Sequence, residues 1–337
     1  MRAILRPSRI LAGVAVAAAV TLVVLWLFPS DDYLLLPDPA HPVGPKVTVQ
    51  GEKPERGPGG IYFVDVSIRR AKLFESLFPG IRSGASLVPA SAVNPPGVSD
   101  KARRQGDFRE MVRSQSIAAA VALRALGYHV VARPTGVLVE AVFASSPAEG
   151  KLQPTDVVVA VDRRRVRTIG QLRRAMSRHR PGDVVRFTIH RGKAIKIVAM
   201  KTVADPGDPT RAVVGFQPSQ AADIKLPIKV RIDLGDVGGP SAGLAFALEV
   251  MEKLGRDVDH GYRVAATGEI GLDGSVGPIG GVKQKAIGAR QGHVDAFVVP
   301  AGDNAAEARR YADGLRIIAV RSFPQALRAL ATLPPRS

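Results

Sequence analysis

Two residues of this chain, a serine and a lysine, have the types and settings that acyl transfer requires. Ser241 follows Pro240 at the start of a helical pattern, and proline suits the first position of a helix. The free N–H groups at a helix N-terminus can hold the oxyanion of an acyl-transfer reaction. The sequence therefore predicts a nucleophilic serine, although a Gly-Gly-Pro-Ser turn without any catalytic role would have the same appearance. One face of the predicted helix carries these apolar residues: Leu244, Leu248, Met251 and Leu254.

The lysine lies on the apolar side of a second helical pattern. The residues that share this face are Val282, Lys285, Ala286 and Ala289, whereas Lys283 points to the other side. Burial lowers the pKa of an amine because it disfavours the charged form; a shift from about 10.4 to roughly 7.5 requires about 4 kcal/mol. A neutral Lys285 could then accept the hydroxyl proton of a serine. The alternative is a lysine whose stem packs on the core while its ammonium stays in water.

Three blocks around these residues resemble the proteolytic domain of Lon-type (S16 family) Ser-Lys proteases. The blocks are Gly239–Gly243, Thr267–Glu269 and Gly277–Lys285. The resemblance implies that Ser241 is the nucleophile, that Lys285 is the base and that Thr267 bonds the lysine amine. The same blocks supply the supporting residues Glu269, Gly239, Pro240 and Ala242. Lon proteases usually have an acidic residue three positions before the serine, whereas this chain has Gly238 there and Asp236 further upstream.

The resemblance extends upstream of the serine. Alternation predicts a strand over residues 60–68, and a helix is expected over 108–126. In Lon-type domains a strand and a helix of this kind precede the catalytic half. The Pro/Gly/Ser-rich segment 80–107 between them is expected to be a long loop.

A second module interrupts the first over residues 135–204. Its short alternating runs, separated by turn residues, predict a small β-rich domain, and the series resembles a bacterial PDZ domain. PDZ domains bind an extended peptide by adding it to a sheet edge. The resemblance implies a peptide-binding loop that offers backbone donors at Gly136, Val137, Leu138 and Val139. The alternative is a β-rich spacer that binds nothing.

The N-terminal segment predicts a membrane anchor. Residues 10–28 form an uncharged, largely apolar run that would span about 29 Å as a helix, close to the thickness of a hydrocarbon core. The arginines that precede it are Arg2, Arg6 and Arg9. This basic flank favours a cytoplasmic N-terminus, a single pass through the cell membrane and an extracytoplasmic catalytic domain. A signal peptide cleaved near residues 17–19 is the competing interpretation.

The expected architecture is an α+β fold, in which an N-terminal transmembrane helix precedes a Lon-type α/β domain that carries the PDZ insertion. The predicted segments are a basic N-terminus (1–9), the helix (10–28), a stiff Pro-rich linker (29–45), the first part of the Lon-type domain (46–134), the PDZ domain (135–204) and the catalytic part (205–337).

Composition and missing motifs exclude several classes of function. The chain has no cysteine, no phosphate-binding Gly-x-x-x-x-Gly-Lys-Ser/Thr motif and no His-Glu-x-x-His motif, so we expect no ATPase, no metal and no cofactor. The histidines are scattered and are assigned to structural or surface positions: His41, His129, His179, His190, His260 and His293. The formal net charge is +17, and eight arginines fall between residues 163 and 180. Because no aromatic residues alternate with them, we expect a solvated face, or contact with an anionic membrane surface, and no nucleic-acid partner.

These patterns imply an ATP-independent, membrane-anchored serine endopeptidase similar to those of Gram-positive, actinobacterial origin. Its expected partners are extracytoplasmic or membrane-associated protein and peptide substrates, which the PDZ domain would recruit or admit, and a homo-oligomer that the resemblance suggests is a hexamer. One alternative is an inactive Lon-like scaffold that acts as a PDZ adaptor. Another is an α/β-hydrolase, because Gly239 to Gly243 also match Gly-x-Ser-x-Gly and His293 follows, with Asp259 or Asp273 as the acid.

Overall fold

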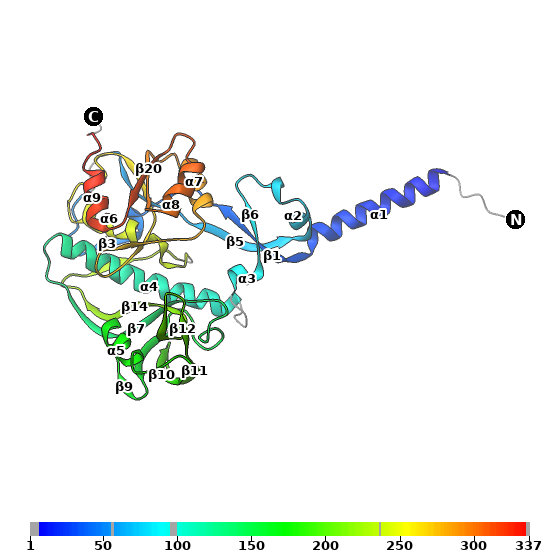
Figure 1. Cartoon of the computed structure of the whole chain (residues 1–337). Helices are drawn as coiled ribbons and strands as arrows, with labels where there is room; N and C mark the ends of the chain where they lie inside the picture. The colour runs from blue at the N-terminus through cyan, green and yellow to red at the C-terminus, as the bar shows by residue number, and fades with distance from the viewer. Residues whose placement is uncertain (1–6, 55–56, 95–99, 236, 335–337) are drawn as a thin grey trace.

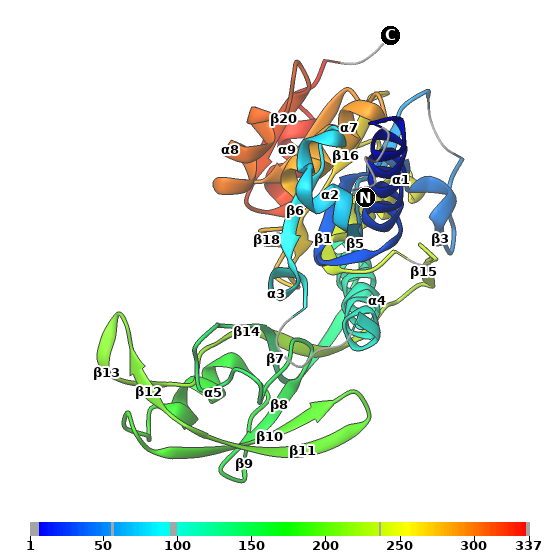
Figure 2. The same cartoon turned by 90° about the vertical axis from the view of Figure 1, so that its right-hand side faces the viewer.

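The computed structural model describes residues 7–54, 57–94, 100–235 and 237–334. A helix extends from a body with two lobes, and the long helix α4 (Asp100–Ala125) lies between the lobes (Figures 1 and 2). The upper lobe combines the N-terminal and C-terminal parts of the chain, and the lower lobe is formed by its middle. The expected mixture of α and β structure is confirmed. Asp236 lies outside the described residues.

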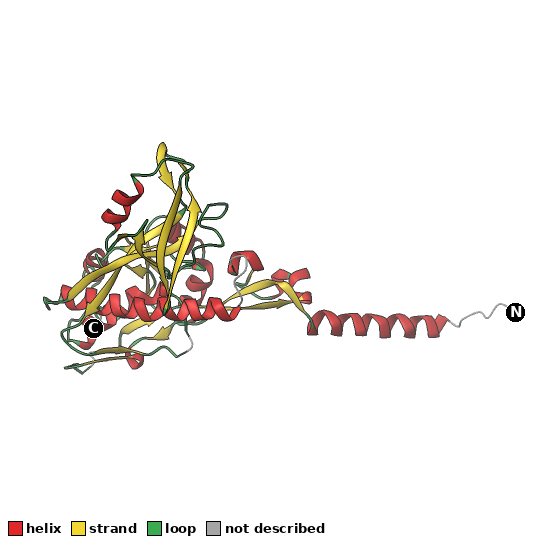
Figure 3. Cartoon of the chain, turned by 90° about the horizontal axis from the view of Figure 1, so that it is seen from below, coloured by secondary structure: helices red, strands yellow, loops and turns green. Residues whose placement is uncertain are grey.

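Helix α1 (Pro7–Leu27) projects away from the rest of the structure, and only its C-terminal end packs against it, where the rings of Trp26 and Phe74 lie 5.8 Å apart (Figure 3). From Leu11 onward nearly all of its side chains are exposed, including Trp26. Over the part of the chain whose side chains the structure describes, no helix is long and apolar enough to cross a membrane. The transmembrane helix predicted over 10–28 is therefore unsupported.

The predicted linker over 29–45 is wrong, because this segment is folded. Strand β1 (Pro29–Pro37) is the middle strand of a three-stranded sheet, between β5 (Val66–Lys72) and β6 (Ser86–Pro89). Tyr33 and Leu34 of this strand are buried. Its prolines stand at its two ends, where a missing N–H costs least, so a high proline content did not prevent a strand.

A five-stranded sheet with order β2-β4-β16-β19-β20 forms the centre of the upper lobe. Its strands are β2 (His41–Pro42), β4 (Gly60–Phe63), β16 (Arg263–Ala266), β19 (Ala296–Pro300) and β20 (Arg316–Val320). The last four pair in parallel, and helices cross between the strands after β16. Smaller elements of this lobe are β3 (Val47–Val49), α2 (Leu73–Leu77), β15 (Val230–Ile232), β17 (Glu269–Ile270) and β18 (Val276–Gly277).

Alternation along the parallel strands creates two separate cores. Val264 and Ala266 point toward α6 (Gly243–Lys253) and α9 (Phe323–Leu330), whereas Ala265 between them points toward the opposite core. That second core contains α7 (Val282–Gln291) and α8 (Asp303–Arg310). The sheet is therefore covered on both faces, which is typical of parallel strands.

Three local predictions need correction. The strand expected over 60–68 ends at Phe63 and restarts as β5, which belongs to another sheet. Helix α4 begins at Asp100 rather than at residue 108, because its charged first turns show no apolar period. The expected loop over 80–107 contains β6 and the short helix α3 (Ala90–Val93).

The lower lobe has its own sheet and its own hydrophobic core. The sheet is six-stranded: five strands follow the order β11-β10-β8-β7-β14, and β9 pairs with β8. The elements are β7 (Val131–Val142), β8 (Val157–Val161), β9 (Arg164–Arg165), α5 (Ile169–Met176), β10 (Val184–Arg191), β11 (Ala194–Lys201) and β14 (Phe216–Lys225), with a separate hairpin of β12 (Val203–Asp205) and β13 (Asp208–Val213). The lobe thus extends beyond residue 204. Leu172 and Ala175 of α5 are buried while its arginines are exposed, as expected for a solvated basic face.

Candidate active site

Ser241 lies in a single turn of 3-10 helix, η3 (Pro240–Ala242), that leads directly into α6. Gly239 before this turn has φ +90°, a backbone conformation that favours glycine. Its N–H donates to the carbonyl oxygen of Asp107 at 3.0 Å. Helix α4 thus fixes the approach of the chain to the serine.

A second contact from α4 lies on the other side of the serine. The hydroxyl of Ser114 donates to the carbonyl oxygen of Pro240 at 3.0 Å, and a Cβ at Gly243 would come within 2.7 Å of that hydroxyl oxygen. The predicted apolar face of α6 is buried, and the helix is in addition buried on all its other sides from Gly243 to Met251. Ala242, directly after the serine, belongs to the same hydrophobic core as the buried residues of α6.

The Thr-Gly-Glu block holds the serine backbone from the sheet side. The N–H of Gly268 donates to the carbonyl oxygen of Ser241 at 2.7 Å, and the Thr267 hydroxyl donates to the same oxygen at 3.1 Å. Thr267 follows β16 directly, so the rigid parallel sheet sets its position. The serine carbonyl is therefore held by two donors.

Lys285 extends from α7 into the interior and is only 4% exposed. Its Nζ donates to Oγ1 of Thr267 at 3.4 Å, so one threonine hydroxyl contacts both the serine backbone and the lysine amine. Burial lowers the pKa of Lys285 to about 8, against an opposing effect of the Asp65 carboxylate. About a quarter of the amine is neutral at pH 7.5 with such a pKa. Lys283 points away, and its Nζ donates to the carbonyl oxygen of Ala85 at 2.9 Å.

A cleft of about 880 Å³ exposes the serine and the lysine to the same space. Among the residues predicted from the sequence, those that line it are Ser241, Lys285, Gly239, Pro240 and Glu269. The lower lobe contributes Glu140 and Pro154 to its wall, so the cleft lies between the lobes. His260 and His293 do not line this cleft, and the geometry therefore gives no support to an α/β-hydrolase triad.

Glu269 faces a carboxylate of the other lobe. Burial, and then the neighbouring Glu140, raise the pKa of Glu269 to about 7, and the two side chains share a hydrogen bond. Glu110 of α4 lines the same wall, and burial raises its pKa to about 7 as well. This side of the cleft is acidic, and its charge depends on pH near neutrality.

The predicted peptide-binding residues do not form a loop. Gly136, Val137, Leu138 and Val139 lie in the middle of β7, with β14 on one side and β8 on the other. The N–H of Val139 already donates to the carbonyl oxygen of Asp156 at 2.8 Å. A peptide carboxylate would have to find its donors elsewhere, so the loop interpretation is wrong.

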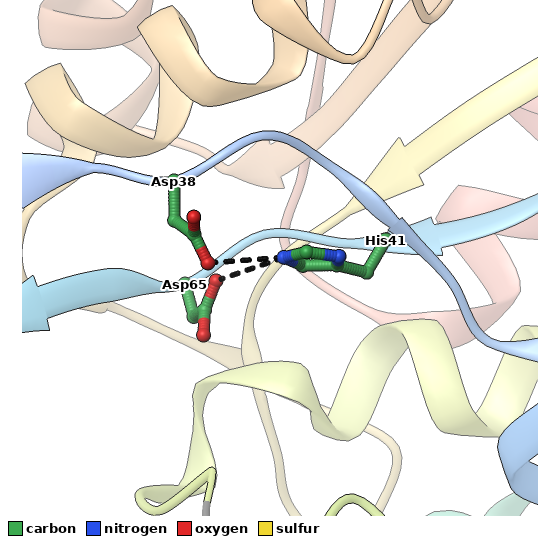
Figure 4. A group of neighbouring side chains, drawn as sticks. All are labelled: Asp38, His41 and Asp65. Atoms are coloured by element: carbon green, nitrogen blue, oxygen red, sulfur yellow. Dashed lines mark hydrogen bonds and ion pairs between the residues drawn. The ribbon is translucent and has the colours of Figure 1, made fainter.

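A second cluster beside the cleft was missed at the level of sequence. Nε2 of His41 lies 3.0 Å from Oδ2 of Asp38 and 4.0 Å from Oδ1 of Asp65 (Figure 4). Asp65 lines the catalytic cleft, and burial, then the nearby Asp38 carboxylate, raise its pKa to about 6. Two carboxylates and an imidazole could ligate a cation, but no further observation at the cluster points to a metal. The Asp-x-x-His spacing was its one local signal.

Comparison with known proteins identifies both modules. Residues 219–331 match the model of the Lon protease (S16) C-terminal proteolytic domain, and residues 124–202 match the PDZ domain. Lon protease 2 of Bacillus subtilis is 36% identical over 124 residues, which cover 36% of this chain and 21% of that protein. Lon protease 1 of Sorangium cellulosum is 35% identical over 106 residues, covering 28% of this chain and 13% of that protein. The chain thus matches only a minor part of the length of these relatives.

Comparison with solved structures found similarity to a part of this chain. The PDZ domain of an SdrC-like protein from Listeria monocytogenes is 20% identical, with a TM-score of 0.24, covering 25% of this chain and 87% of that one. The family matches show that the chain carries the proteolytic domain of a Lon-type serine peptidase together with a PDZ domain.

Proposed function

We propose that this chain is an ATP-independent serine endopeptidase in which Ser241 attacks the peptide carbonyl and Lys285 accepts the serine proton. The observation that carries the proposal is the buried Lys285 amine, which shares one cleft with Ser241 and contacts it through Thr267. An amine with a pKa of about 8 is neutral often enough near pH 8 to act as a general base.

The mechanism follows from this arrangement. Lys285 takes the hydroxyl proton as the Ser241 oxygen attacks, and backbone N–H groups near the serine stabilise the oxyanion. The resulting ammonium donates the proton to the leaving amine, and water then hydrolyses the acyl-enzyme. Thr267 keeps the lysine amine directed at the serine because it is itself bonded to the serine backbone.

Replacing each of the two lysines of α7 tests this assignment. We expect Lys285→Met to lower kcat by on the order of a thousandfold or more, because the serine loses its base. Lys283→Met is the matched control and should retain activity, since Lys283 points to the opposite side. The measurement is hydrolysis of an unfolded protein together with labelling of Ser241 by an acylating reagent.

Two results of that experiment would contradict the proposal. If the wild-type chain fails to label at Ser241, the alternative of an inactive scaffold is favoured. If Lys285→Met labels as fast as wild type, the base is another group.

We further propose that the PDZ lobe admits or recruits substrate. Glu140 and Pro154 of that lobe line the cleft, so a chain entering the cleft passes the lower lobe. A PDZ domain that captures a C-terminus needs its free carboxylate. We expect an unfolded protein with an amidated C-terminus to be cleaved several times more slowly than the free acid at low substrate concentration. A short internal peptide should be insensitive to amidation, and equal rates for both proteins would exclude recruitment through the C-terminus.

Membrane anchoring and assembly belong to the same proposal. The exposed apolar side chains of α1, preceded in the sequence by Arg2, Arg6 and Arg9, support anchoring through residues 10–28 with the catalytic domain outside the cell. Anchored protein should remain with membranes after alkaline carbonate extraction, and added protease should degrade it in intact cells. Release by carbonate would contradict anchoring. Oligomerisation, with six subunits as the resemblance suggests, is tested by the mass of the detergent-extracted protein.

A further inference from the structure

Asp65 lies where the chain packs against the first turn of α7. Val64 before it belongs to the same core as Val282 and Ala286 of that helix. Val66 after it packs on Gly281, where a Cβ would come within 2.7 Å of the valine Cγ2. These contacts on both sides hold the backbone of Asp65 beside the helix that carries Lys285.

One oxygen of the Asp65 carboxylate accepts no hydrogen bond within the described residues, and its ion pair with His41 is long. Oδ1 is buried and, within the part of the chain that the structure describes, has no hydrogen-bond partner. The His41 ring bonds to Asp38 instead and stays 4.0 Å from this oxygen (Figure 4). A buried carboxylate oxygen without a partner costs free energy, so such a group in a native fold requires an explanation.

Charge provides that explanation. Asp65 lines the cleft that holds Ser241 and Lys285, and its negative charge favours the ammonium form of the lysine. The groups that face Asp65 from neighbouring segments are Asp38, which follows β1, His41 of β2, and Lys285 on α7. Asp38 adds like charge and His41 lowers the pKa of Asp65, while the Lys285 ammonium is the charged form in the cleft that the Asp65 carboxylate favours.

We propose that Asp65 is a positioning residue of the peptidase, which stabilises the Lys285 ammonium formed when the serine proton is transferred. The inference rests on the proposed function. Lys285 enters the reaction as a neutral amine in a buried site, and proton transfer from Ser241 creates a positive charge there. A carboxylate already fixed by the surrounding packing meets this charge without reorganisation. Asp38 and His41 keep Asp65 in place.

The test is the pH dependence of kcat/KM for a short peptide, which no binding step at the PDZ lobe complicates. Without the carboxylate the amine loses its proton more easily, so Asp65→Asn should move the acidic limb by about one pH unit to lower pH. The plateau should fall about 10- to 100-fold because the ammonium formed in the transition state is less stable. Asp65→Glu keeps a carboxylate and should return the acidic limb of the pH profile most of the way to its wild-type position.

The matched control is Asp257→Asn. Asp257 and His260 form another Asp-x-x-His pair, with a ring-nitrogen-to-carboxylate distance of 3.9 Å, but neither residue lines the catalytic cleft. Asp257→Asn should show the wild-type acidic limb and the wild-type plateau of kcat/KM. A similar shift in it would show a general charge effect and overturn the proposal.

Failure of the inference is distinguishable from failure of the proposed function. If wild-type Ser241 labels with an acylating reagent but Asp65→Asn keeps the wild-type limb, Asp65 has no role in the proton transfer. A lower melting temperature with an unchanged limb would make its role structural only.

If Asp65→Asn does not fold, Asp65→Ser serves instead, and a wild-type acidic limb in it would overturn the proposal. Activity lost with a chelator and restored by zinc would overturn it in favour of a metal site.

Discussion

At the scale of single residues, the hydroxyl of Thr267 connects the Ser241 backbone with the Lys285 amine. Thr267 donates to the serine carbonyl oxygen and accepts from the lysine amine, so a methyl group cannot replace its hydroxyl without loss. Because the lysine is buried, the loss of this acceptor removes a polar partner that water does not readily replace.

We therefore predict that Thr267→Val lowers kcat about 10- to 100-fold with little change in KM, because the lysine amine loses its orientation. Thr267→Ser keeps the hydroxyl and should retain activity within a few-fold. Steady-state kinetics of both variants measure the difference. Equal losses in the two would show that the Thr267 hydroxyl alone does not account for the effect.

The helix start at Ser241 and the buried position of Lys285 were predictable because each lies in a local pattern. The apolar spacing of α7 placed Lys285 on its buried face, and the structure confirms that burial. The cluster at Asp65 was not predictable in this way, because it forms only when His41 of β2 pairs with Phe63 of β4. Such pairing joins distant segments and leaves no periodic signal in either. Tyr33 and Leu34 show the same limit: their burial in β1 overrides the proline content that predicted a linker.

At the scale of elements, α7 is set directly on the segment between β1 and β2. Gly288 packs so closely on Asp38 that an added Cβ would overlap the aspartate carbonyl oxygen, and the N–H of Ala40 donates to the Gly288 carbonyl oxygen at 3.0 Å. This close approach fixes the position of the helix that carries Lys285 relative to Asp38 and to the start of β2 at His41.

Gly288→Ala should therefore lower the free energy of unfolding by about 2 to 3 kcal/mol, because the backbones must separate to admit the methyl group. Gly170→Ala in α5 is the matched control, since a Cβ there meets nothing closer than 4.0 Å. That change should be neutral or stabilising by up to about 1 kcal/mol, as alanine favours helix. Urea unfolding measures both, and equal midpoints would contradict the close packing of α7.

The sequence did less well on the elements of the lower lobe. Alternation predicted its β-rich character, and Val137 and Val139 do face its core. However, the same residues were assigned to a binding loop by resemblance, whereas all four residues from Gly136 to Val139 are buried within a strand that has neighbours on both sides. The pairing of β14 with β7 joins residues on either side of the whole module, so the position of that last strand had no local signal.

At the scale of the whole molecule, the two lobes meet at paired carboxylates. Glu140 comes from β7 and Glu269 from β17, and the pKa of Glu269 is raised to about 7 from an ordinary value of 4.5. Between these pH values the folded state binds more protons than the unfolded state, so stability falls as pH rises through the window. The contact between the lobes is accordingly strongest under mildly acidic conditions.

Glu269→Gln should raise the free energy of unfolding at pH 8 by about 1 to 2 kcal/mol, after allowance for partial exposure, and should have little effect at pH 5. Glu307→Gln on α8, which does not line the cleft, is the control and should not change the pH dependence. Thermal melting between pH 5 and pH 8 checks this. A Glu269→Gln variant with the wild-type pH profile would show that the carboxylate is freely hydrated.

The short segment after Phe63, where β4 ends and before β5 begins, joins two sheets that have different neighbours. One is the sheet that sets the position of Thr267; the other lies at the base of α1, where the N–H of Leu73 donates to the carbonyl oxygen of Phe28 at 3.0 Å. Asp65, which lines the catalytic cleft, is within this joint. Residues 38–40 join the same two sheets a second time, from β1 to β2, so the cleft is tied to the base of the N-terminal helix by two short peptide segments.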